Sequence, residues 1–285
     1  MLNTIEDIIL SKDGRGISNL RDSLSKDYCK QAAKFVLKNK GVVMITTGFY
    51  IAKARASETD GPPGAIAIGN ALDQLGYTVI YVSDKYTVKY LSAMKKNNAL
   101  IVEFPIEEDL SSKNFAMNII NKYKPQLIIS IERCGFDETF SYRNMHGVDF
   151  SNYNAKIDYL FSNKINSVGI GDGGNEIGMG DFIEKIVETS SLVRYPSITK
   201  TTFSIIASVS NWGGYGLVAA LSNIVGENLL ISIEEEIKLI NTLVDLGAVD
   251  GFSAKNINKV DGFNLQDNSF ALINLHELIN RTIKR

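Results

Sequence analysis

Residues 42–47 read Val-Val-Met-Ile-Thr-Thr and stop at Gly48. The run is apolar and β-branched without polar alternation, which is typical of a strand buried on both faces. A segment with helical spacing follows at residues 65–75 and ends at Gly76, a residue suited to a helix C-cap. Residues 78–82, Thr-Val-Ile-Tyr-Val, then form the next expected strand. Strand, helix and strand in this order predict a parallel βαβ unit.

The same pattern repeats along the chain. We expect further strands at residues 99–102, 126–131, 167–170 and 203–207, and helices at residues 86–95, 114–122 and near 154–161. The sequence therefore predicts an α/β fold with a doubly wound, mostly parallel sheet and helices on both faces, a Rossmann-like three-layer sandwich.

The length fits one α/β domain over residues 1–285, with an excursion of loop and helix near 132–166 that covers the site. From residue 234 onward we expect mainly helix, with a break rich in Gly, Asp and Asn at residues 247–268. No repeat or linker divides the chain.

Composition narrows the classes of partner. With 30 basic and 32 acidic side chains the formal net charge is -2, so the basic surplus of a nucleic-acid-binding protein is absent. No run reaches the roughly 18 apolar residues of a membrane span, and the N-terminus has neither a secretory nor a transit pattern. We therefore expect a cytoplasmic protein that acts on a small molecule, an amino acid or carboxylate. The sequence leaves open whether the protein forms a homo-oligomer. The two cysteines, Cys29 and Cys134, do not suggest a disulfide framework.

Polar residues follow the predicted strands. In open parallel sheets ligands bind beyond the carboxyl ends of the strands, so these positions are the candidate site. Thr47 and Gly48 end the first strand, and Asp60 precedes the helix that begins near residue 62. Asp60 is either a simple helix cap or a site residue. Glu132 and Arg133 end the fourth strand, where a charged pair is either an internal ion pair or bound to a ligand.

A glycine-rich segment follows the fifth strand. Residues 169–180 read Gly-Ile-Gly-Asp-Gly-Gly-Asn-Glu-Ile-Gly-Met-Gly and formally satisfy the dinucleotide fingerprint G-x-G-x-x-G. Asp172 and Glu176 argue against that interpretation, because carboxylates repel a pyrophosphate. Together with Asn175 they are oxygen donors of the kind that bind Mg²⁺ or Mn²⁺. A purely structural glycine-rich turn is the alternative.

Two further segments complete the candidate site. After the sixth strand, Ser210 and Asn211 suit the cap of a helix, and the exposed amides there suit a carboxylate or phosphate. Capping without a ligand is an equal alternative. Asn144 offers a polar side chain in the loop at residues 142–149, and the lone His146 beside it is more often structural than catalytic.

Four of these segments, taken in order, resemble the D-glutamate cyclase-like C-terminal domain family. They are residues 58–65 (Glu-Thr-Asp-Gly-Pro-Pro-Gly-Ala), 132–135 (Glu-Arg-Cys-Gly), 144–149 (Asn-Met-His-Gly-Val-Asp) and 171–180 (Gly-Asp-Gly-Gly-Asn-Glu-Ile-Gly-Met-Gly). The resemblance runs over nearly the whole chain. It implies conversion of D-glutamate to 5-oxo-D-proline with loss of water, and an acidic pocket that binds a metal. In larger members of the family this domain follows a hydro-lyase-like domain.

The chemistry of cyclisation assigns roles to these residues. A base must take the ammonium proton, and an acid or a metal must help the oxygen to leave. We expect Glu132 to act as the base, and Arg133 or the amides near Asn211 to hold the α-carboxylate. The expected set is Glu132, Arg133 and Asp60 as catalytic residues, Thr47, Gly48, Asn144, Ser210 and Asn211 as substrate-binding residues, and Asp60, Asp172, Asn175 and Glu176 as ligands of Mg²⁺ or Mn²⁺.

Two alternatives stay open. Residues 171–176 are similar to the last motif of haloacid dehalogenase-type phosphatases, which suggests a metal-dependent phosphatase. That family also needs an aspartate nucleophile after the first strand, where this chain has Thr46, Thr47 and Gly48. The second alternative is a metal- or ligand-sensing domain without catalysis. A cyclase consumes D-glutamate, a phosphatase releases phosphate, and a sensor binds its ligand without turnover.

Overall fold

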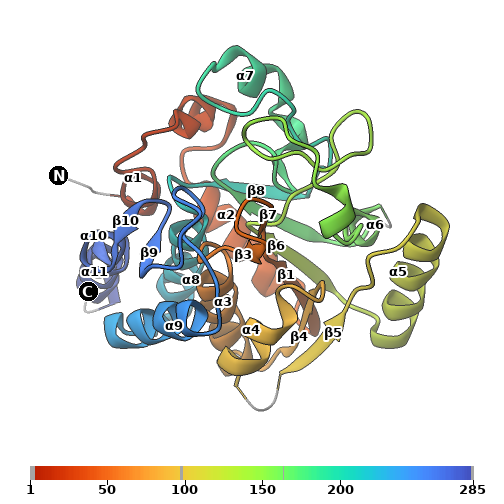
Figure 1. Ribbon diagram of the computed structural model, residues 1–285. Helices are drawn as coiled ribbons and strands as arrows, with labels where there is room; N and C mark the ends of the chain where they lie inside the picture. Colours follow the sequence, from red (N-terminus) through yellow and green to blue (C-terminus); the bar gives the residue numbers. More distant parts are fainter. Residues whose placement is uncertain (1–3, 97–98, 163, 284–285) are drawn as a thin grey trace.

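The computed structural model describes residues 4–96, 99–162 and 164–283 (Figure 1). Within these ranges six parallel strands form the central sheet in the order β5-β4-β1-β6-β7-β8. They are β1 Val42–Thr47, β4 Thr78–Ser83, β5 Leu100–Glu103, β6 Leu127–Ile131, β7 Ser167–Gly171 and β8 Phe203–Ile206. The expected doubly wound α/β fold is confirmed, and all six predicted strands are present.

Helices cover both faces of the sheet. The larger core joins the sheet to α2 (Tyr28–Lys38), α3 (Pro62–Gln74) and α8 (Ser210–Val225). The opposite face is covered by α5 (Asp109–Tyr123) and α6 (Asp158–Phe161). Successive side chains of β1 point to opposite faces of the sheet. Val43 and Ile45 belong to the larger core and Met44 to the smaller one.

The remaining helices surround this sandwich. They are α1 (Ile5–Ile9), α4 (Val88–Met94), α7 (Ile183–Glu188), α9 (Ile233–Asp245), α10 (Leu265–Asn268) and α11 (Phe270–Ile283). Although they come from opposite ends of the chain, α1 and α11 lie side by side and both pack against α8 (Figure 1). None of the helices in the described ranges combines the length and apolarity needed to cross a bilayer.

The site lies where the winding of the sheet reverses. β1 pairs with β4 on one side and with β6 on the other, so loops from β1 and β6 diverge at their carboxyl ends. Thr47 lies opposite Ile131, which brings Gly48 and Glu132 together. The amide of Gly48 donates to the carbonyl of Glu132 at 3.1 Å. Such a switch point is the usual ligand position in an open α/β sheet.

Three local expectations differ from the structure. The helix expected near 154–161 is only α6, because residues 151–153 form a separate 3-10 turn. The helix expected from residue 86 begins at Val88, since the carboxylate of Asp84 accepts the Tyr86 amide and holds a turn there. The break at 247–268 contains a small hairpin, β9 (Lys259–Val260) and β10 (Phe263–Asn264). A second hairpin, β2 (Tyr50–Ile51) and β3 (Ala56–Ser57), follows β1.

Candidate active site

A cavity of about 520 Å³ opens above the carboxyl ends of the strands. Its wall contains four carboxylates, Glu58, Glu132, Glu176 and Asp261, together with the guanidinium of Arg15. Asp60 and Asp172 do not line the cavity but lie next to it, and both are fully buried. These six carboxylates form what we call the acidic floor: Glu58, Asp60, Glu132, Asp172, Glu176 and Asp261.

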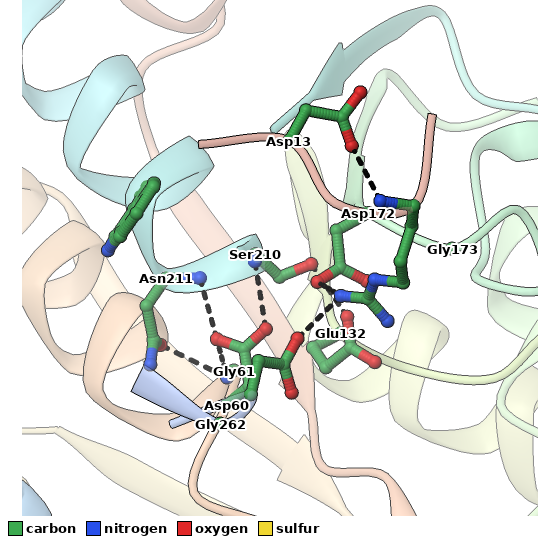
Figure 2. A network of polar contacts seen from close by, with 12 residues as sticks. Asp13, Asp60, Gly61, Glu132, Asp172, Gly173, Ser210, Asn211 and Gly262 are labelled. Carbon is green, nitrogen blue, oxygen red and sulfur yellow. Dashed lines mark hydrogen bonds and ion pairs between the residues drawn. The ribbon is translucent and has the colours of Figure 1, made fainter. Parts of the chain in front are cut away.

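Asp60 is fixed by the N-terminus of α8 (Figure 2). Its carboxylate oxygens accept the amides of Ser210 and Asn211, each at 2.8 Å. In return the Asn211 side-chain oxygen accepts the amides of Gly61 at 3.0 Å and Gly64 at 2.8 Å, at the start of α3. Each helix start is therefore capped by a residue from the other. The amides of Ser210 and Asn211, which the sequence suggested as donors to a ligand, donate to Asp60 instead.

Glu132 has an unusual backbone. Its φ of 44° lies in the left-handed region, which is costly for a residue with a side chain and is found preferentially at functional sites. Its Oε2 accepts a hydrogen bond from the Ser210 hydroxyl at 2.6 Å. A β-carbon on Gly61, whose φ is 94°, would come within 2.6 Å of the Glu132 Cβ and of the Thr47 hydroxyl. Glycine at position 61 therefore makes room for Glu132.

The glycine-rich loop after β7 is held by one of its own carboxylates. Glu176 accepts the amides of Gly173 and Gly174, both at 2.7 Å, and so closes the turn that presents Asp172. Asn175 donates its side-chain amide to the carbonyl of Arg143 at 2.8 Å, which ties the covering excursion to this loop. Among the described residues the Asn175 Oδ1 has no hydrogen bond, and Asn175 lines the cavity.

Arg133 does not line the cavity. The side chain is 1% exposed, and its Nη1 donates to Asp84 at 2.6 Å and to the carbonyl of Gly48 at 3.0 Å. Its Nη2 donates to the carbonyl of Ala155 at 2.9 Å, inside the excursion. The geometry thus gives Arg133 the role of an internal ion pair, the alternative that the sequence left open. Thr47 and Gly48 also lie outside the cavity wall.

Asn144 lines the cavity, as expected, but its side chain is engaged locally. Its Oδ1 accepts the amides of His146 and Val148, each at 3.0 Å, and so shapes the loop at the cavity mouth. The imidazole of His146 belongs to the same wall.

Arg15 and Asp261 were not predicted as site residues, and Glu58 was noted only within the segment 58–65 that carries the family resemblance. The Nη2 of Arg15 contacts the carboxylate of Asp172 and that of Asp261, the latter at 2.5 Å. The carboxylate of Asp13 accepts the Arg15 amide at 3.0 Å and fixes the loop that carries it. Arg15 precedes the first strand, and Asp261 lies in the hairpin turn between β9 and β10. Neither position follows a strand of the sheet, so the rule that located the other residues could not find them.

Burial raises the pKa of four carboxyl groups of the acidic floor, Glu58, Asp60, Glu132 and Asp172, and neighbouring negative charges add to the effect. Burial, reinforced by the charge of Asp261, raises the pKa of Asp60 to about 7. Burial also raises the pKa of Glu132 well above its usual value, with the charges of Glu176 and Asp60 adding to it. For Glu58 burial acts in the same direction, strengthened by Glu132. Several buried negative charges this close together need protons or cations to offset them.

Two groups of carboxylates have the geometry of a cation site. One is Asp60, Asp172 and Asp261, the other is Glu132, Asp172 and Glu176, and within each group the oxygens lie within 4.8 Å of one another. Carboxylate oxygens in this number fit Mg²⁺ or Mn²⁺. The guanidinium of Arg15 contacts two members of the first group. The expected ligands Asp60, Asp172 and Glu176 thus belong to these groups, and Asp261 joins them.

Comparison with known proteins gives the family. The model of the family described as D-glutamate cyclase-like, C-terminal matches residues 5–276. The human protein D-glutamate cyclase, mitochondrial (Homo sapiens) is 32% identical over 229 residues, covering 73% of this chain and 36% of the relative. The chain thus spans about a third of the length of that curated relative. The resemblance found from the motifs is confirmed, and the chain belongs to the D-glutamate cyclase-like C-terminal family.

Proposed function

We propose that this chain converts D-glutamate to 5-oxo-D-proline and water in the cavity above the acidic floor. The observation that carries the proposal is Glu132, a buried carboxylate in a left-handed backbone conformation on the cavity wall. It follows the strand next to β1, at the switch point of the sheet, and burial raises its pKa. A carboxylate with a raised pKa is a stronger base and is matched to proton transfer near neutral pH. Membership of the D-glutamate cyclase-like family supports the choice of reaction.

Cyclisation moves two protons from nitrogen to oxygen. The α-ammonium loses a proton, the amine attacks the side-chain carboxyl carbon, and a C–N bond forms as a C–O bond breaks. In our proposal Glu132 accepts the ammonium proton. Glu58 lines the same cavity, and burial with the nearby charge of Glu132 favours its protonated form. Glu58 is then the acid that protonates the side-chain carboxylate, and after the C–N bond forms it takes the second proton from nitrogen. Glu132 passes its proton to the departing hydroxyl, so that water leaves and both carboxyl groups regain their starting protonation.

Asp60 supports this pair rather than meeting the substrate. Its carboxylate is held by the α8 amides, and it does not line the cavity. Its negative charge helps to raise the pKa of Glu132 and of Glu58. Ser210 donates its hydroxyl to Glu132 and orients the base. The expected roles of Asp60 and Ser210 therefore become roles in positioning and electrostatics.

We also propose a divalent cation, Mg²⁺ or Mn²⁺, held by Asp60, Asp172 and Glu176 with Asp261, and with the Oδ1 of Asn175 available. Two groups that share Asp172 support this fit: the carboxylate oxygens of Asp60, Asp172 and Asp261 lie within 4.8 Å of one another, and so do those of Glu132, Asp172 and Glu176. A bound cation would draw electrons from the side-chain carboxylate of the substrate and offset the charge of the acidic floor.

The test is turnover of both enantiomers. Purified protein is dialysed against chelator, supplied with Mg²⁺, Mn²⁺ or neither, and incubated with D- or L-glutamate while chromatography follows 5-oxoproline. We expect product from D-glutamate alone, and more of it with the cation than after chelation. If folded, cation-loaded protein forms no 5-oxoproline from D-glutamate and none from L-glutamate, the cyclase proposal is refuted. Equal rates with and without chelator would refute only the cation.

The phosphatase alternative has less support. Thr47, which ends β1, and Gly48, which follows it, carry no carboxylate nucleophile. A phosphate-release assay on the same preparation decides this point. A sensing domain would show a ligand-dependent rise in melting temperature without any product.

A further inference from the structure

Arg15 is held at one nitrogen and open at the others. Both of its carboxylate contacts, to Asp172 and Asp261, use Nη2. Within residues 4–96, 99–162 and 164–283, Nη1 and Nε make no hydrogen bond. The side chain is 31% exposed and lines the cavity. Nη1 lies 3.8 Å from the point that a β-carbon on Gly173 would take, so it belongs to the cavity wall.

A guanidinium with this arrangement is ready for a second carboxylate. It is planar and carries five N–H donors in a rigid fork that matches carboxylate geometry. With Nη2 fixed by two aspartates, the plane of the group is set. The Nη1 donors are then available to a ligand without a search over rotamers.

An unpartnered hydroxyl on the same wall is the second observation. The Ser208 side chain is 8% exposed, and its Oγ is buried without a hydrogen-bond partner in the described parts of the chain. Ser208 lines the cavity that Arg15 lines. A buried hydroxyl left unpaired is unfavourable, so such a group at a cavity indicates a missing acceptor.

The other cations of the cavity wall are less suited to this role. Lys12 is 3.2 Å from the carboxylate of Asp267, and its Nζ lies 4.7 Å from the centre of the Phe270 ring. Lys53 is exposed. Arg15 contacts the acidic floor directly. An anionic substrate that approaches this floor is therefore attracted to the guanidinium of Arg15.

We propose that Arg15, through Nη1, binds the α-carboxylate of the substrate, with the Ser208 hydroxyl as a second donor, and so selects substrates with a free α-carboxylate. This inference rests on the proposed function and names the residue that gives it specificity. The α-carboxylate keeps its charge throughout cyclisation, whereas the side-chain carboxylate loses an oxygen. A fixed cation can therefore hold it from substrate to product.

The experiment compares D-glutamate with its α-amide, which keeps the amine and the side-chain carboxylate but has no α-charge. Wild-type protein and the variants Arg15→Gln and Arg15→Lys are assayed for cyclisation of both compounds. For Arg15→Gln we expect kcat/KM on D-glutamate to fall about 10- to 150-fold, the range of a hydrogen bond to a charged group, mainly through KM. On the α-amide the fall should be less than about threefold. Arg15→Lys should lie between, because it keeps the charge and loses the fork.

Arg21→Gln is the matched control, since Arg21 pairs with Asp7 at 2.8 Å away from the cavity wall. It should leave both substrates unchanged. Circular dichroism and melting temperature show whether each variant is folded, and Arg15→Lys decides the question if Arg15→Gln is not. An equal loss on both compounds would overturn the inference and leave Arg15 a structural role.

The failure of the inference is distinguishable from failure of the proposed function. If wild-type protein makes no product, calorimetry measures binding of D-glutamate and of the α-amide to wild type and Arg15→Gln. Tighter binding of D-glutamate that disappears in the variant would support the inference although the reaction is wrong. Binding of both compounds that Arg15→Gln leaves unchanged, or no binding of either, would overturn it.

Discussion

Arg133 and Arg15 both contact aspartates near the carboxyl ends of the strands, but their surroundings differ. Both terminal nitrogens of Arg133 are bound to Asp84 and to two carbonyls, and its Nε, which has no partner among the described residues, is closed off from solvent. Arg15 uses one nitrogen on Asp172 and Asp261 and turns the rest of its fork to the cavity wall. The sealed region around Arg133 joins β1, β6 and the excursion. The cavity region around Arg15 is open to a ligand.

This difference separates two uses of buried charge. A charge whose donors or acceptors are consumed by the protein contributes to stability, because removing it leaves its partners unsatisfied. A charge with spare hydrogen-bonding capacity at a cavity is available to a substrate. We therefore expect changes in the cavity region to alter catalysis or binding, and changes in the sealed region to alter the free energy of unfolding.

The largest effect is expected for Glu132→Gln in the cavity region. Losing the proposed base should lower kcat by about 10²- to 10⁴-fold. The melting temperature should not fall, because the variant removes a buried charge that burial disfavours. Turnover of D-glutamate and a thermal scan measure the two quantities. The exposed Glu188→Gln is the control, and wild-type kcat in Glu132→Gln would remove the carboxylate from the mechanism.

The sealed region should respond in the opposite way. Arg133→Met leaves Asp84 buried and unpaired, so we expect a loss of about 3–5 kcal/mol in the free energy of unfolding. Urea titration measures this loss, and KM for D-glutamate is measured where the variant is still folded. KM should stay at the wild-type value. Arg281→Met, at an exposed position, should change stability by less than about 0.5 kcal/mol.

The reverse outcome would restore an earlier interpretation. The sequence predicts that either Arg133 or the amides near Asn211 hold the α-carboxylate. A raised KM with an unchanged unfolding free energy would give Arg133 that role and erase the contrast with Arg15.

The contrast also shows what sequence reasoning can reach. Buried strands without alternation predict the parallel sheet, and their ends locate Glu132 and Asp172, because backbone pairing alone fixes those positions. Whether a residue at such an end faces the cavity depends on side-chain partners. The Arg133 side chain points into the protein because Asp84 and two carbonyl oxygens accept its hydrogen bonds there.

Site residues that lie in loops could not be predicted from the sequence for a different reason. Arg15 and Asp261 meet although 246 positions separate them. Asp261 depends on a hairpin whose turn is fixed by Asp250, since the Asp250 carboxylate accepts the Gly262 amide at 2.7 Å. No periodicity in the sequence encodes such a meeting. It follows from tertiary packing, since α1, shortly before Arg15, and Phe263 of the hairpin both pack against α8.

Asp137 is a buried carboxylate that accepts several hydrogen bonds, and it predicts how stability depends on pH. Asp137 accepts the amide and hydroxyl of Thr139, at 2.8 and 2.6 Å, and the Nε of Arg143 at 2.8 Å. Although burial alone would raise its pKa, these hydrogen bonds outweigh burial and lower it. The folded pKa lies below the unfolded one, so the stabilisation is present above about pH 4 and is lost as pH falls through the folded pKa.

For Asp137→Asn we therefore expect a loss of about 1–2 kcal/mol at pH 7 that shrinks at acid pH. Urea titrations at neutral and acid pH measure the difference from wild type. The exposed Asp22→Asn should show no such trend. A deficit that grows on acidification would contradict the assignment, because the sign would be that of a carboxylate with a raised pKa.

The smallest effect is expected for Ser208→Ala, and it is the finest test of the contrast. In a sealed region the loss of a buried hydroxyl would leave its partner unpaired and destabilise the protein. The Ser208 hydroxyl has no partner in the described chain and lines the cavity, so its removal should leave the melting temperature unchanged or slightly higher. KM for D-glutamate should rise about 2- to 10-fold, the worth of one hydrogen bond, while the exposed Ser190→Ala changes neither. A lower melting temperature with an unchanged KM would show that the hydroxyl serves the fold, and Arg15 would then hold its carboxylate alone.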